Sequence, residues 1–254
     1  MSVTAGKPER QRSHPPHRQR PAHLKPGRHE HRDVSGGWLR PTVFGAMDGL
    51  VTNVSLIAGV GGGGLDRSRI ILTGLAGLVA GAFSMATGEY TSVTSQNELV
   101  LAEVEVERRQ LESYPDEEKA ELAAAFVDKG VEPQLAERVA EQVSRDHDEA
   151  LRLHAKEELG VDPDELPSAW VAALSSFFAF SIGAVIPLLP YLAGSASLLL
   201  AIGVAAAALL ITGGIVARLT AQSIWYGALR QLGLAALAAG VTYGVGRGIG
   251  TSVS

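Results

Sequence analysis

Charge is distributed so unevenly along this 254-residue chain that it limits the class of fold. From Leu166 to Ala217, 52 consecutive residues include no Asp, Glu, Lys or Arg, whereas residues 101–167 carry 20 acids and 8 bases. A soluble domain intersperses its charges, because every helix or strand keeps one face in water. The pattern therefore predicts an integral membrane protein with a charged insertion.

Five stretches are long and apolar enough to cross a hydrocarbon core of about 30 Å, which takes about 20 helical residues. None of them shows the strict alternation of a barrel strand. We therefore expect an all-α protein with five transmembrane helices and a helical insertion between the second and the third. The expected spans are residues 38–60, 70 to beyond 89, 169–189, 193–217 and 232–253.

The N-terminal residues 1–36 form a basic segment with almost no large apolar side chain. Such a segment buries too little apolar surface to offset the entropy of ordering, so we expect a disordered arm. Its histidines could collect metal, but their irregular spacing favours a solvated tail near anionic lipid. These are His14, His17, His23, His29 and His31. The rest of the chain divides into the first two transmembrane helices (37–98), the insertion (99–166) and the last three transmembrane helices (167–254).

Lysines and arginines predict the orientation in the membrane. With the N-terminus in the cytoplasm, 19 of these bases lie inside and only Arg67, Arg69 and Arg247 lie outside. This excess follows the tendency of cytoplasmic loops to be positive. The insertion is then cytoplasmic, and a bacterial plasma membrane is the expected location.

The sequence of the insertion shows where its helices start and end. Helix is expected to continue from the second span to about Glu112 and to restart at Pro115, because proline suits the first helical turn. This second helix ends near Gly130. A third runs from about Pro133 to Gly160, with a break near Asp146, which would cap the next helix.

Two acids lie within the expected membrane spans, and one of them is close to a methionine. A methionine alone in such a span is usually packing, so the acids are the better evidence for a metal path. An ionisable group there costs at least about 2.5 kcal/mol on insertion scales, so the presence of Asp48 indicates that it binds a cation or a proton or pairs with another charge. The alternative is a shallow acid whose side chain reaches the membrane interface. Met85 and Glu89 lie four residues apart and share a helix face. Three small residues near that face would allow another helix to approach, at Gly77, Gly81 and Gly88.

Carboxylates also recur at helical spacing in the insertion, in the pairs Glu103 with Glu107, Glu118 with Glu121, and His154 with Glu157 or Glu158. Brought together in a bundle, such faces give a shell that suits Fe, Mn, Co or Zn. A solvated bundle with 20 acids produces such spacings by chance, so spacing alone leaves the surface interpretation open.

Three motifs resemble the vacuolar iron transporter family. They are Asp48-Gly-Leu-Val-Thr-Asn, Ser84-Met-Ala-Thr-Gly-Glu-Tyr and Glu157-Glu-Leu-Gly. The resemblance covers residues 36–254, including the five-span plan. It implies export of Fe(II), and often Mn(II), from the cytosol with proton exchange, by a homodimer whose pore lies between the subunits.

The same resemblance assigns roles to individual residues. It places the family's membrane-site Asp and Met on Asp48 and Met85, and the Glu of its Gly-Glu-Tyr motif on Glu89. In the insertion it places a first ligand pair on Glu107 and Gln110. One ligand is therefore missing there, and Glu103, one turn earlier, is a substitute.

The remaining ligands implied by the resemblance lie on the second and third helices of the insertion. The second-helix pair falls on Glu118 and Glu121. In the third helix His154 stands where the family often has Met, and Glu158 follows it.

We therefore expect a homodimeric exporter of Fe(II), with Mn(II) as a second substrate, whose partners are metal ions, protons and the lipid bilayer. The alternative is a membrane-anchored metal buffer or sensor, but an anchor has no reason to keep an acid within its spans. No nucleophile–base pair, phosphate loop or cofactor motif is visible, so neither an enzyme nor a prosthetic group is expected. Nucleic acid is not an expected partner.

Overall fold

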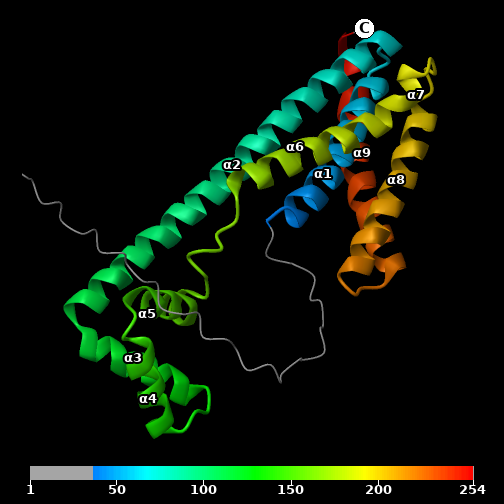
Figure 1. The fold of residues 1–254 in the computed structure, drawn as a ribbon. Helices are drawn as coiled ribbons and strands as arrows, with labels where there is room; N and C mark the ends of the chain where they lie inside the picture. Colours follow the sequence, from blue (N-terminus) through cyan, green and yellow to red (C-terminus); the bar gives the residue numbers. More distant parts are fainter. Residues whose placement is uncertain (1–36, 254) are drawn as a thin grey trace, which may run out of the picture. The chain divides into compact units, whose positions relative to one another are not determined.

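The computed structural model describes residues 37–253, and every regular element in that range is helical (Figure 1). The arm predicted for residues 1–36 lies outside the described residues. The membrane part contains α1 (Leu39–Gly62), α2 (Arg67–Ser113), α6 (Ala169–Val185), the 3-10 turn η2 (Ile186–Leu188), α7 (Leu189–Leu192), α8 (Leu198–Leu219) and α9 (Ile224–Val253). The insertion contains α3 (Pro115–Asp128), α4 (Pro133–Val143), α5 (His147–His154) and the π-helical turn η1 (Ala155–Leu159).

Five of these segments are long and apolar enough to cross a membrane, which confirms the predicted five-span, all-α architecture. Their boundaries differ in places. The third span is interrupted at η2, because Pro187 and Pro190 cannot continue a regular helix. The fourth begins only at Leu198, since Gly194 turns the chain with φ 100°. The fifth begins at Ile224, eight residues before the expected start.

Glycines allow α1 to pack closely against two other spans. A Cβ atom at Gly49 would overlap the carbonyl oxygen of Phe180 in α6, and one at Gly246 in α9 would overlap that of Gly59. Small residues of this kind let helix backbones approach inside a membrane, where close packing holds helices together. The first span is therefore held between α6 and α9.

Helix α2 is a single helix of 47 residues. At a rise of 1.5 Å per residue it measures about 70 Å, more than twice the hydrocarbon thickness. The helix therefore continues well past a membrane and supplies the first helix of the insertion, as predicted. Where the chain returns towards α6, the Asn97 side chain donates a hydrogen bond of 2.9 Å to the carbonyl of Pro167.

The insertion has two small apolar cores. Val104 and Leu111 of α2 pack against α5 residues that include Leu151, and Leu122 of α3 packs against alanines of α4 such as Ala136. The predicted helix starts are confirmed. Helix α3 starts at a proline, and Asp146 caps α5 by accepting a hydrogen bond of 3.3 Å from the Glu149 amide. These cores fix the faces that α2, α3 and α5 turn towards one another.

Candidate metal centre

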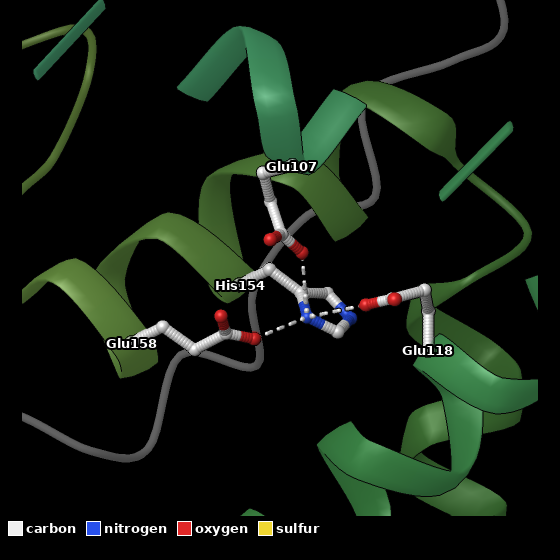
Figure 2. A group of neighbouring side chains, drawn as sticks. All are labelled: Glu107, Glu118, His154 and Glu158. Carbon is white, nitrogen blue, oxygen red and sulfur yellow. Dashed lines mark hydrogen bonds and ion pairs between the residues drawn. The ribbon is translucent and has the colours of Figure 1, made fainter. Parts of the chain in front are cut away.

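Three helices of the insertion bring four ligand-type side chains together (Figure 2). Glu107 comes from the far part of α2, Glu118 from the first turn of α3, and His154 and Glu158 from α5 and η1. Their donor atoms all lie within 4.8 Å of one another. The cluster is largely buried: the side chains of His154, Glu118 and Glu107 are 1%, 7% and 11% exposed. Long carboxylate side chains are seldom buried unless they are paired.

All three carboxylates of the cluster approach the same imidazole nitrogen. The Nδ1 atom of His154 lies 3.1 Å from Glu107 Oε1, 3.2 Å from Glu158 Oε1 and 3.7 Å from Glu118 Oε2. One ring nitrogen carries one proton at most, so it can donate to only one of these oxygens. Its hydrogen bond is with Oε1 of Glu158. The nearby Oε1 atom of Glu107 is buried and accepts no hydrogen bond within the described residues. The three carboxylates therefore offer more acceptor oxygens than the one imidazole N–H can satisfy.

Burial and mutual repulsion alter the acidity of this site. Burial, followed by the charge of Glu158, raises the pKa of Glu107 to about 7, although His154 acts in the opposite direction. Burial also raises the pKa of Glu118, and the neighbouring Glu121 adds to the effect. These carboxyl groups are costly to ionise in the protein alone. A divalent cation at the centre would supply the missing counter-charge.

The geometry suits a transition-metal ion. Ligands bound at about 2.1 Å lie about 3 Å apart when adjacent in an octahedron and about 4.2 Å apart when opposite. The separations in the cluster are close to this range, so small side-chain rotations would close the shell. Three carboxylates and one imidazole are a donor set that suits Fe, Mn, Co or Zn.

The other three acids predicted as ligands in the insertion lie outside this group of four. Glu103, one turn before Glu107, is exposed. Glu121 lies beside the cluster and lines an adjacent cavity of about 240 Å³ together with Glu157. Glu157 forms an ion pair with Lys129 at the end of α3. That pair was missed in the sequence, because no spacing rule relates residues 28 positions apart.

The three residues predicted for the membrane site lie on α1 and α2. Asp48 is half-buried and accepts a hydrogen bond of 3.4 Å from Thr52, one turn later. Met85 packs against an apolar cluster that includes Phe180 of α6, and Glu89 is partly exposed. Within residues 37–253 no hydrogen bond or ion pair joins these three side chains.

Two of the three glycines near Met85 lie where other membrane helices come close. A Cβ at Gly77 would overlap Leu56, and one at Gly81 would overlap Phe180, so both glycines pack against spans of the same chain. Only Gly88 has open space around it. The expected close approach of another helix is therefore confirmed at Gly77 and Gly81, and the approaching helices are α1 and α6 of the same chain.

Asn53 is a buried polar residue to which the sequence analysis gave no role. It is 0% exposed, and its amide donates a hydrogen bond of 2.5 Å to the carbonyl of Ala184 in α6. An amide in the middle of an apolar span is the signal that points to such a residue, since polar groups in a membrane need partners. The bond fixes α1 against α6, five residues after Asp48.

Comparison with known proteins places this architecture in a family. The model of the VIT family matches residues 39–247. The "Vacuolar iron transporter" of Acanthamoeba castellanii is 35% identical over 227 residues, which cover 85% of this chain and 81% of the relative. The "Vacuolar iron transporter 1" of Oryza sativa subsp. japonica is 31% identical over 232 residues, covering 90% and 91%. The chain is thus a multi-pass membrane protein that belongs to the VIT family.

Proposed function

We propose that this protein exports Fe(II) from the cytosol, with Mn(II) as a second substrate, in exchange for protons. Relatives named vacuolar iron transporters support the iron substrate. The observation that carries the proposal is the cluster of three carboxylates and one imidazole in the insertion, in which Glu107, Glu118 and His154 are buried and Glu158 is exposed. Its mixed oxygen and nitrogen donors favour a transition metal over Mg or Ca.

In this proposal the insertion is cytoplasmic and captures the ion. Glu107, Glu118, His154 and Glu158 bind it first, and the cation relieves the repulsion among the three carboxylates. Glu121 lines the adjacent cavity and would attract a cation towards the cluster. Because the site is built from three helices, binding would also hold α2, α3 and α5 together.

The membrane step would use Asp48 and Met85, with Glu89 one turn beyond Met85. Asp48 supplies a charged oxygen ligand, and the thioether of Met85 favours transition metals over harder ions. Glu89 and Glu107 lie on the same helix α2, about 27 Å apart along its axis. The ion must therefore leave the cluster in the insertion before it reaches the membrane residues. Protonation of Asp48 or Glu89 from the outer side would weaken the coordination of the metal and release it. Because the same carboxylate binds either the metal or a proton, transport would be coupled to protons.

A homodimer would complete the coordination shell in the membrane. One subunit offers a single acid in the first span and one Met–Glu pair in the second, which is few ligands for an ion that takes four to six. A two-fold axis doubles each ligand, because the same residues of both subunits meet there. Asp48 and Glu89 both keep exposed surface in the single chain, as such an arrangement requires.

Flux measurements test this function against the rival, a membrane-anchored metal buffer. Purified protein in proteoliposomes should move Fe(II) and Mn(II), and an imposed pH gradient should accelerate that movement. Metal entry should in turn drive proton movement that a pH-sensitive dye reports. Stoichiometric metal binding without flux under either condition would favour the buffer and reject the transporter.

A further inference from the structure

The connection between α8 and α9 forms a basic pocket at the end of two membrane helices. Its volume is about 440 Å³, and its lining includes Thr220, Gln222, Tyr226 and Arg230. The helices nearly touch at one wall of the pocket, where a Cβ atom at Gly227 would overlap Ala217. The pocket is therefore a defined cavity where the two helices diverge.

Arg230 is a cation without an acidic partner in its surroundings. It takes part in no ion pair or hydrogen bond with any residue of the described range 37–253; its one recorded contact is with the ring of Tyr226, 5.6 Å from its Cζ atom. No Asp or Glu occurs in the sequence after Glu165, whereas Arg218 and Arg230 flank this connection. A counter-anion for these arginines is thus missing from the whole C-terminal part of the chain.

The position of Arg230 along α9 places its charge near the helix end. It lies six residues after Ile224, about 9 Å along the axis. Its guanidinium lies over Tyr226, one turn back towards that end, which is the direction in which a membrane arginine reaches for the interface. Tyr226 and Gly227 belong to the first turn of α9, where the helix dipole is also positive.

The surroundings of the pocket are those of a membrane interface. Trp225 is 76% exposed, and Tyr226, Leu219 and Leu229 are exposed as well. Trp and Tyr concentrate where lipid headgroups meet the hydrocarbon core. A ligand that contacts both the arginine and these apolar side chains needs an anionic head and an apolar body.

From these observations we infer that this pocket binds the phosphodiester of a phospholipid whose headgroup is net negative. The phosphate pairs with Arg230, since a guanidinium matches phosphate oxygens with two parallel hydrogen bonds. A zwitterionic headgroup would bring an ammonium to a site that already has unpaired positive charge and no acid. The acyl chains lie along the exposed apolar surface beside the pocket.

Native mass spectrometry of the full-length protein in detergent tests this inference. The probes are phosphatidylglycerol and phosphatidylcholine with identical acyl chains, and inorganic phosphate alone. Arg230→Gln is compared with Arg247→Gln, which removes the same charge from the same helix outside the pocket. Arg230→Lys keeps the charge without the paired hydrogen bonds, and it remains informative if the glutamine variant folds poorly.

The expected result is selective retention of phosphatidylglycerol by the wild type and by Arg247→Gln. Arg230→Gln should bind it about fivefold more weakly, the loss expected for one basic side chain at an anionic surface, and Arg230→Lys should be intermediate. Equal retention of phosphatidylcholine would overturn the inference. So would equal losses in Arg230→Gln and Arg247→Gln, or occupation by inorganic phosphate that displaces the lipid.

Discussion

Replacing Glu107 by Gln should have opposite effects on the metal-free and the metal-loaded insertion. Glutamine has nearly the volume of the carboxyl group but cannot ionise, so it removes a buried charge and at the same time a ligand. Above pH 7 the metal-free variant should therefore be more stable than the wild type. Added Mn(II) should stabilise the wild type but not the variant.

The size of the effect follows from the raised pKa of Glu107. In the unfolded chain this carboxyl ionises near pH 4.5, and in the folded insertion near pH 7. Between these values the folded state binds more protons, so stability falls as the pH rises. The full loss is about 3 kcal/mol and is complete above pH 7. Since the side chain is only 11% exposed, solvent screening removes little of it.

Amide hydrogen exchange, followed by mass spectrometry on the intact protein, measures this locally. Peptides from α3 and α5 report opening of the insertion without requiring the membrane helices to unfold. Glu103→Gln is the matched control, since it removes an exposed acid one turn earlier on α2. If metal-free Glu107→Gln exchanged faster than the wild type above pH 7, the desolvation argument would be refuted.

Three further outcomes are expected. Met85→Leu should keep the packing against Phe180 but lower the flux of Fe(II) relative to that of Mn(II), measured by competition; an unchanged ratio would remove the thioether from the path. Gly49→Ala should lower the yield of folded protein, because its Cβ would overlap α6, whereas Gly88→Ala, in open space, should not. Single cysteines introduced along α2 should cross-link two copies most strongly on the side of Glu89, and a maximum on the opposite side would place the dimer axis elsewhere.

The helices were predictable because their signals are local. Absence of charge marked the spans, and Pro115 and Asp146 marked helix starts in the insertion. The start of α9 was placed too late because a search for uncharged residues stops at Arg230. A helix end can include an arginine that reaches the interface, so charge locates the apolar core of a span better than its ends.

The candidate metal centre was predictable only in part, because helical spacing gives a face but not its neighbour. The spacing of His154 and Glu158 places both on one side of a helix, and the structure brings them together with Glu107. Glu157 is adjacent in sequence, yet it pairs with Lys129 from another helix. Which acid of a repeated series faces inwards depends on the apolar cores that orient α2, α3 and α5.

The most direct test of the proposed transport compares Fe(II) flux by the wild type and by Asp48→Asn in the same proteoliposomes. Asparagine keeps the shape and the contact with Thr52 while removing the charge. Calorimetry should show that Asp48→Asn still binds metal at the insertion, because the cluster of Glu107, Glu118, His154 and Glu158 is unchanged. We predict that Asp48→Asn loses transport while it retains binding; wild-type flux by this variant would contradict a path through the first span.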